Sequence, residues 1–207
     1  MRNVFVFLCV GCVGLGACSE SDTDLSRMDL KIFQDNKTGA MIFSGRPTKI
    51  TDGDTIVLAG VLKIRMAGID APESRQRCVD ENGVEYACGK MATQHLRQII
   101  GAARVQCRLH GNDRYGRYIM TCHKPDGTDI HEQMVRDGYA VVSTYGPDTY
   151  LAAETAARDN KRGLWRGAFG HPYCFRHQKT SGDMFRVLCA DNKYYRGWDI
   201  KKDKASK

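Results

Sequence analysis

The sequence predicts an α+β fold that is mainly β: a five-stranded, OB-type Greek-key barrel with about three helices, followed by a small cystine-bounded C-terminal appendage. Two observations carry this prediction. Short runs of β-forming residues, punctuated by glycine, fill residues 41–66 and indicate a meander of strands. The elements that follow come in the order helix, two strands, helix, helix, which is typical of a small barrel that carries helices. The 207 residues, 42% of them hydrophobic, suffice for the core of one such domain.

The strands of the meander are short and are separated by tight turns. Asp52-Gly53 and Ala59-Gly60 supply the turn residues. Two further strands, from Val105 to Leu109 and from Arg117 to Cys122, flank a loop at 110–116. The four runs of the meander are Met41-Ile42-Phe43, Thr48-Lys49-Ile50, Thr55 to Leu58 and Lys63 to Met66.

Three helices are predicted from apolar residues that recur at helical spacing. The first covers about 89–100 and ends at Gly101, and the second covers about 128–137 and ends at Gly138. The third covers about 148–161. The inward positions are Met91, His95, Leu96, Ile99 and Ile100 in the first helix, Ile130, Met134 and Val135 in the second, and Leu151, Ala152, Ala156 and Ala157 in the third.

Residues 1–18 are interpreted as a signal peptide with a lipobox-like end. The apolar run from Val4 to Ala17 fits the hydrophobic region of a secretory signal and is too short to span a bilayer comfortably. The final Leu15-Gly16-Ala17-Cys18 makes Cys18 the candidate for lipidation, and cleavage near Ala17 with free release is the alternative. The chain is therefore expected to be exported: lipid-anchored to a membrane and facing the periplasm or the exterior, or otherwise secreted.

The rest of the chain divides into three parts. Residues 19–40 are polar, with acids concentrated at their start, and are predicted to be a tether. Residues 41–167 are the predicted barrel domain, and residues 168–207 are a basic C-terminal extension with a disulfide hairpin. The chain has a net charge of +7, and residues 161–207 hold twelve Lys or Arg against four Asp or Glu. This extension could contact nucleic acid, bind a cell-surface polymer, or simply be solvated.

Six of the nine cysteines remain when the signal peptide is removed and Cys18 is set aside for lipid. Each of three pairs flanks a chain reversal symmetrically, so each can form a local disulfide at ordinary Cα separations. Export favours disulfides over buried free thiols, which are the alternative. Among these six, no C-x2-C spacing indicates a zinc site. The predicted bridges are Cys78–Cys88, Cys107–Cys122 and Cys174–Cys189.

Three short patches supply acids and arginines in an order that suits chemistry at a phosphodiester. They are Asp52-Gly53-Asp54-Thr55, then Arg65 with Asp70-Ala71-Pro72-Glu73, then Asp113 to Arg117. Acids can hold a cation and handle a proton, and guanidinium groups can receive developing negative charge. Any one of these residues alone is weak support, because an aspartate at a glycine turn is usually only a turn former.

Asp54 and Asp70 each lie at the end of a predicted strand. Side chains at the strand ends of a barrel converge on one rim, so these two carboxylates are expected to share a hard cation such as calcium or magnesium. Arg65 lies five residues before Asp70, and a bulge at Ala67-Gly68 would bring the two side chains to one face. The six histidines form no ligand pair at helical spacing and are assigned no catalytic role.

These motifs resemble the signatures of the staphylococcal nuclease (thermonuclease) family. The family patterns D-G-D-T, R-x4-D-x-P-E and D-x-Y-G-R occur here in the same order. The similarity runs from about residue 47 to Trp165 and includes the ending Lys161-Arg162-Gly163-Leu164-Trp165. The tether, the loop at 78–88 and the cystine-bounded C-terminus lie outside this similarity or elaborate on it.

The resemblance implies the roles of the acids. Asp54 and Asp70 would bind Ca²⁺ with help from the backbone carbonyl of Ala71. Glu73 would be the general base, or would orient the attacking water.

The resemblance also implies how the substrate is held. Arg65 and Arg117 would grip the scissile phosphate and receive the charge of the five-coordinate transition state. Tyr115, Tyr145 and Arg114 would contact the nucleotide, and half-buried packing is the alternative for the two tyrosines.

The implied activity is that of a calcium-dependent phosphodiesterase, an endonuclease similar to thermonuclease. It would hydrolyse DNA and RNA to 3′-phosphate and 5′-hydroxyl ends and act as a monomer. The alternative is a catalytically silent OB-type module that binds nucleic acid or a surface partner. Family members without activity usually lack the arginines or the glutamate, and Arg65, Glu73 and Arg117 are all present here.

Overall fold

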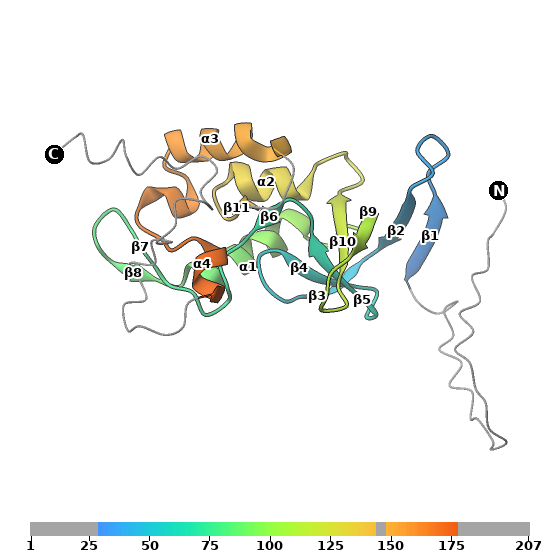
Figure 1. The fold of residues 1–207 in the computed structure, drawn as a ribbon, viewed down its shortest axis with the longest axis horizontal. Helices are drawn as coiled ribbons and strands as arrows, with labels where there is room; N and C mark the ends of the chain where they lie inside the picture. Colours follow the sequence, from blue (N-terminus) through green and yellow to red (C-terminus); the bar gives the residue numbers. More distant parts are fainter. Residues whose placement is uncertain (1–28, 144–147, 178–207) are drawn as a thin grey trace, which may run out of the picture.

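The computed structural model describes residues 29–143 and 148–177 (Figure 1). The predicted signal peptide with Cys18, and also Tyr145 and Cys189, lie outside the described residues. What the sequence predicts for them therefore stays a prediction. Within the described residues, no helix has the length and apolar character needed to cross a membrane.

The main sheet closes into a barrel because the consecutive strands β2 and β3 pair with strands at opposite sides of the sheet. That order is β1-β2-β9-β10-β5-β4-β3. Strands β2 and β3 are separated only by Arg46, and β2 pairs with β9 whereas β3 pairs with β4. Strands β5 and β10 pair in parallel, and the other neighbours pair antiparallel. The strands are β1 (Leu30–Gln34), β2 (Met41–Gly45), β3 (Pro47–Ile50), β4 (Thr55–Leu58), β5 (Leu62–Met66), β9 (Val105–Asn112) and β10 (Tyr118–His123).

Strand β1 lies outside the closed ring and is an addition to it. The ring itself runs through β2 with β3, then β4, β5, β10 and β9. The tether predicted over 19–40 is wrong for residues 30–34, because these residues pair with β2 from Leu30↔Gly45 to Gln34↔Met41. Asp35 stabilises the connecting turn, since its carboxylate accepts hydrogen bonds from the following backbone N–H groups at 37 and 38.

The helices pack against one end of the barrel (Figure 1). Three of them stand where the sequence predicts: α1 (Cys88–Ile100), α2 (Ile130–Arg136) and α3 (Leu151–Asp159), with short 3₁₀ turns η2 (Asp148–Tyr150) and η3 (Gly163–Arg166). Asp129 begins α2, because its carboxylate accepts from the backbone N–H groups of His131 and Glu132. Gly138 follows the helix with a φ of +77°, which favours glycine. Strands and helices share one core, which includes Ile56, Ile64, Met66, Leu96, Met120, Ile130 and Met134.

His131 is a buried link within this core. Its Nε2 accepts from the backbone N–H of Cys122 at 2.8 Å, which requires the proton on Nδ1. Nδ1 then donates to the carbonyl oxygen of Ala67, also at 2.8 Å. Burial lowers the pKa of His131 to about 4. The neutral ring therefore joins α2, β10 and the turn that follows β5.

Two of the predicted disulfides are present. Cys107 and Cys122 face each other across β9 and β10, and the bridge between them has a Cα–Cα distance of 4.1 Å. Cys78–Cys88, with a Cα–Cα distance of 5.6 Å, ties the hairpin of β7 (Cys78–Val79) and β8 (Glu85–Tyr86) to the start of α1. Cys174 is disulfide-bonded, and because Cys189 lies outside the described residues its pairing stays a prediction.

The C-terminal extension begins with a helix instead of the strand-like arm of a hairpin. Helix α4 (Pro172–His177) carries Cys174, so the predicted hairpin is wrong for this arm. The chain reaches α4 through an antiparallel bridge between Val79 and Ala168, in which each residue's N–H donates to the other's carbonyl oxygen at 2.8 Å. Gly167 permits this approach, since a Cβ there would lie 2.1 Å from the carbonyl oxygen of Val79. The start of the extension is therefore docked on the domain.

Candidate active site

The first acid, Asp54, is placed by a turn that only a glycine fits. The carboxylate of Asp52 accepts from the backbone N–H of Asp54 at 3.0 Å, which fixes the turn before β4. A Cβ on Gly53 would lie 2.6 Å from the Cβ of Ala71 and 2.9 Å from that of Ala92 in α1. The strand end therefore packs directly on α1, and Asp54 is only 6% exposed.

The second acid, Asp70, reaches the first through Arg65. The Nη2 of Arg65 donates to Oδ1 of Asp70 at 3.0 Å, and its Nη1 pairs with Oδ2 of Asp54. A turn at Ala67-Gly68, with Gly68 at φ +76°, separates β5 from β6 (Ile69–Asp70). The predicted bulge is therefore a turn between two strands. It has the effect expected of the bulge, because Arg65 and Asp70 contact each other. Strand β6 is held by pairing with β11 (Val141–Val142).

The acids at 52 and 54 differ in protonation because their surroundings differ. Burial alone would raise the pKa of Asp54, but the charge of Arg65 and a hydrogen bond from the Ala71 backbone N–H at 2.8 Å hold it below the usual value. Burial, together with the negative charge of Asp54, raises the pKa of Asp52 to about 7. Asp54 is therefore ionised at neutral pH, whereas Asp52 titrates close to neutral pH.

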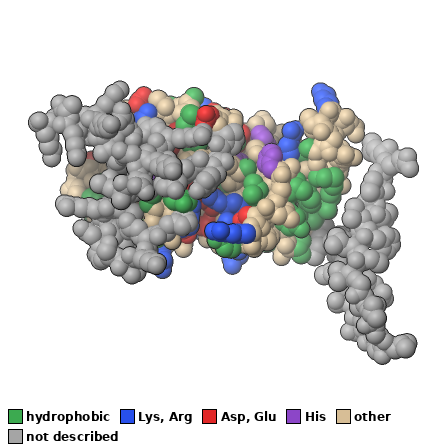
Figure 2. Space-filling model, in the orientation of Figure 1, with side chains coloured by type: hydrophobic (Ala, Val, Ile, Leu, Met, Phe, Trp, Pro, Cys, Tyr) green, Lys and Arg blue, Asp and Glu red, His purple; other side chains and the backbone are tan. Residues whose placement is uncertain are grey.

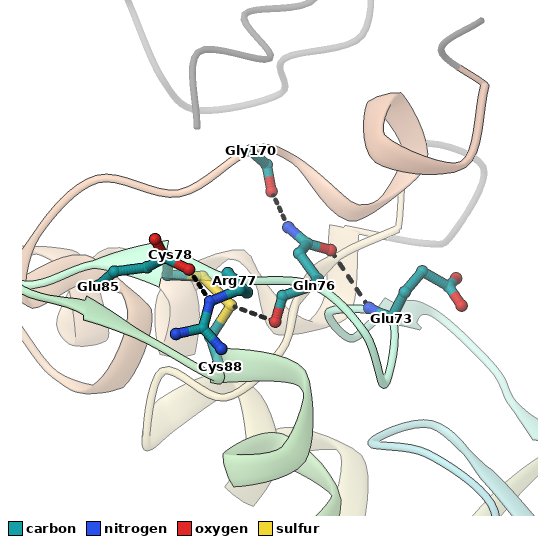
Figure 3. The surroundings of a disulfide bond; sticks show 7 residues. All are labelled: Glu73, Gln76, Arg77, Cys78, Glu85, Cys88 and Gly170. Carbon is teal, nitrogen blue, oxygen red and sulfur yellow. Dashed lines mark hydrogen bonds and ion pairs between the residues drawn. A yellow bond between two sulfur atoms is a disulfide. The ribbon is translucent and has the colours of Figure 1, made fainter. Parts of the chain in front are cut away.

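Glu73 is held by its backbone on a loop against α1. Its N–H donates to Oε1 of Gln76 at 3.2 Å (Figure 3). A Cβ on Gly89 would lie 1.7 Å from the carbonyl oxygen of Glu73, so the loop touches the first turn of the helix. The Cys78–Cys88 bridge and the Arg77–Glu85 ion pair flank this loop (Figure 3). The Glu73 side chain is left about one-third exposed, at 34%.

Arg117 is positioned by Asp113 at the turn between β9 and β10. The Asp113 carboxylate accepts from Nε of Arg117 at 2.7 Å and from the backbone N–H groups of Tyr115 and Arg117. The Nη1 of Arg117 reaches Oγ1 of Thr55 at 3.5 Å, so it faces the start of β4. The guanidinium groups of Arg114 and Arg117 lie 5.0 and 5.8 Å from the Tyr115 ring centre. Tyr115 is 69% exposed, which disagrees with half-buried packing.

One open cavity of about 1120 Å³ collects the three patches. Figure 2 shows basic and acidic side chains gathered in the middle of the molecule. Six of the lining side chains are basic and four are acidic. The lining contains the predicted Asp54, Arg65, Asp70, Glu73, Arg114, Tyr115 and Arg117, and also Asp52, Lys63, Arg75, Ser143, Tyr173, Phe175 and Arg176.

The cavity offers oxygen ligands for a cation, but few. Among the described residues, no group of three or more His, Cys, Asp or Glu side chains is placed to hold a metal ion. Asp54 and Asp70 are 6% and 2% exposed, and each already contacts a guanidinium group, so a cation at these acids would share their charge with arginine. Two buried carboxylates with backbone and water oxygens fit a hard cation such as calcium, not zinc.

Sequence reasoning missed Arg176, which reaches the acids from α4. It lies 106 residues beyond Asp70, and its Nη1 and Nη2 each contact one carboxylate oxygen of Asp70 at 2.8 Å. Its Nη1 also contacts Oε1 of Glu73 at 3.0 Å. No local spacing or motif signals such a contact, because it depends on how the extension docks.

The comparison with known families identifies the family of the chain. A family profile described as "Staphylococcal nuclease homologue" matches residues 63–167. The chain belongs to the staphylococcal nuclease family. The match covers Arg65, Asp70, Glu73 and Arg117, and it ends before α4.

Three relatives show how far the similarity extends. The chain is 38% identical over 124 residues to "Succinoglycan biosynthesis protein ExoI" of Rhizobium meliloti, covering 59% of the chain and 64% of the relative. It is 34% identical over 141 residues to an "Uncharacterized endonuclease" of Escherichia coli, covering 65% and 86%. It is 33% identical over 138 residues to "Micrococcal nuclease" of Shigella flexneri, covering 59% and 74%. The family profile and the relatives named as nucleases together show that this domain is that of a nuclease, which is a hydrolase.

Proposed function

We propose that the protein is a calcium-dependent phosphodiesterase that hydrolyses DNA and RNA to 3′-phosphate and 5′-hydroxyl ends. One observation carries the proposal. Two buried carboxylates, Asp54 and Asp70, share a cavity with two arginines, Arg65 and Arg117, and with the partly exposed Glu73. A cation, a proton acceptor and two guanidinium groups are what in-line attack of water on a phosphodiester needs.

The acids divide the work between cation and proton. Asp54 and Asp70, with the backbone carbonyl of Ala71, would hold Ca²⁺, which when bound polarises a phosphate oxygen as a Lewis acid. Glu73 is exposed enough to meet a water molecule and would take its proton or orient it. Attack by that water on phosphorus breaks the P–O5′ bond, which leaves the phosphate on the 3′ side.

The arginines hold the phosphate. Arg117 is aimed by Asp113 through its Nε, and its Nη1 makes only a long contact of 3.5 Å with Thr55, so its terminal nitrogens can turn to fork onto phosphate oxygens. Arg65 contacts Asp54 and Asp70, the two proposed calcium ligands. Once a cation neutralises part of their charge, the Arg65 guanidinium can turn to bind the phosphate. Charge on the five-coordinate transition state would be received by both groups, and losing one such donor typically costs about 10²–10³ in rate.

Substrate contacts beyond the phosphate come from the turn between β9 and β10. Tyr115 lines the cavity with an exposed ring that Arg114 and Arg117 flank, so it can stack on a base or contact a neighbouring phosphate. The excess of basic over acidic lining favours an anionic polymer. Tyr145 is proposed for the same role from its sequence position alone.

Export is part of the proposal. The bridges Cys78–Cys88 and Cys107–Cys122 suit an oxidising compartment. The apolar N-terminal run that ends at Cys18 supports a lipid anchor facing the periplasm or the exterior, with secretion after cleavage as the alternative. We propose that the protein acts there as a monomer.

The test is digestion of end-labelled single-stranded DNA and RNA by the purified chain with calcium, with magnesium or with EDTA. Cleavage with calcium that EDTA abolishes is expected. Intact substrate in calcium would overturn the proposal, and salt-sensitive binding without cleavage would favour the catalytically silent binding module instead.

A further inference from the structure

Helix α4 places a positively charged side chain of the protein, Arg176, on Asp70, which is proposed to bind calcium, and on Glu73, the proposed base. Arg176 contacts both carboxylate oxygens of Asp70 at 2.8 Å and Oε1 of Glu73 at 3.0 Å. Such paired contacts between a guanidinium and a carboxylate are among the stronger polar interactions in proteins. A guanidinium is charged at any physiological pH, so Arg176 brings a full positive charge to these acids.

The approach of Arg176 is built into the fold. Gln76 is 1% exposed, and its Nε2 donates to the carbonyl oxygen of Gly170 at 2.6 Å while its Oε1 accepts from the N–H of Glu73 (Figure 3). One amide therefore fixes both the chain before α4 and the loop that carries the proposed base. The bridge between Val79 and Ala168 adds to this docking.

A bound divalent cation and Arg176 compete for the same oxygens. Asp70 already shares Oδ1 between Arg65 and Arg176, and its Oδ2 is taken by Arg176. Each carboxylate oxygen has two lone pairs, so guanidinium groups occupy both at Oδ1, and a cation would have to use the second lone pair of Oδ2, directly beside Arg176. Two positive charges at one carboxylate also repel each other across a few ångströms of partly buried space. Binding of the cation and docking of Arg176 are thus antagonistic.

We propose that α4 is an autoinhibitory element in which Arg176 occupies the place of the divalent cation, so that the cation must displace Arg176 to bind at Asp70. The proposal rests on the proposed calcium site. The coupling is reciprocal: docking of Arg176 weakens cation binding by the same free energy by which a bound cation weakens docking of α4. Calcium binding would then both complete the site and release Arg176 from Asp70.

The test is calorimetric titration of calcium into the full chain without nucleic acid, comparing the wild type with Arg176→Ala. Removing the internal competitor should tighten calcium binding about tenfold, the order expected when a charge-assisted contact that blocks the site is lost. Lys63→Ala is the matched control. It removes one positive charge from the lining of the same cavity but lies on β5, so it measures the general electrostatic gain, whereas Arg75 stacks on Phe175 of α4 and would not serve.

A second readout protects the test against misfolding of the variant. In the wild type, calcium should accelerate hydrogen exchange of the backbone amides of α4 as Arg176 leaves Asp70. Equal calcium affinity in the wild type and Arg176→Ala, a gain in Lys63→Ala as large as that in Arg176→Ala, or unchanged exchange in α4, would overturn the inference while leaving the calcium nuclease intact. Failure of all three proteins to bind calcium would overturn the proposed cation site and with it this inference.

Discussion

His131 couples the stability of the fold to pH, and the structure sets the size of the effect. Its pKa is about 4 in the folded protein, against 6.5 in the unfolded chain. As the pH falls below 6.5, the unfolded chain takes up a proton that the folded protein refuses, so the free energy of unfolding decreases until about pH 4. A shift of that size corresponds to at most about 3 kcal/mol. Above pH 6.5 this group contributes no pH dependence.

The comparison with His131→Gln isolates this titration. Asp52, whose pKa is raised to about 7, changes stability in the opposite direction over the same range, but it does so in both proteins and cancels in the difference. Urea unfolding followed by circular dichroism at pH 7, 6, 5 and 4 should show the advantage of the wild type shrinking by up to about 3 kcal/mol. A constant difference across this range, or a titration of His131 near 6.5 by NMR, would refute the reasoning.

Three further predictions concern the cavity. Arg117→Ala should lower kcat by about 10²–10³ while salt-sensitive binding of DNA persists, and a change under tenfold in single-turnover assays would contradict its role. Tyr115→Ala should raise KM severalfold in steady-state assays with little change in kcat, whereas Tyr115→Phe, which keeps the stacking ring, should resemble the wild type. Equal KM values for the wild type and Tyr115→Ala would exclude a substrate contact. Reducing Cys78–Cys88 should lower activity at denaturant concentrations where circular dichroism still reports a folded domain, and loss of both signals together would show that the bridge acts on global stability.

The barrel and the acid and arginine patches could be predicted because their determinants are local. Asp54 lies where it does because Gly53 allows the turn to pack on α1, and Arg65 meets Asp70 because a two-residue turn separates their strands. The bridge Cys107–Cys122 joins directly paired positions of one hairpin, which sequence symmetry alone indicates.

What the sequence did not reveal depends on docking between distant segments. Strand β1 is not predicted from the sequence because its short apolar run follows an acid-rich stretch. It forms because it pairs with β2. The contact of Arg176 with Asp70 spans 106 residues. The chain before α4 is held by Gln76, and nothing in the sequence distinguishes this buried glutamine from one at the surface. Periodicity and motif spacing contain no information about such contacts.

The assignment of Glu73, Asp54 and Asp70 to one calcium-dependent hydrolytic site is tested most directly by analysing product ends. Labelled oligonucleotides of DNA and RNA would be treated with the wild type and with Glu73→Gln, in calcium and in EDTA, and the fragments characterised. We predict 3′-phosphate and 5′-hydroxyl fragments from the wild type in calcium only, with the rate lowered about 10²–10⁴ in Glu73→Gln. Fragments with 3′-hydroxyl ends, cleavage in EDTA, or an unchanged rate in Glu73→Gln would contradict the assignment.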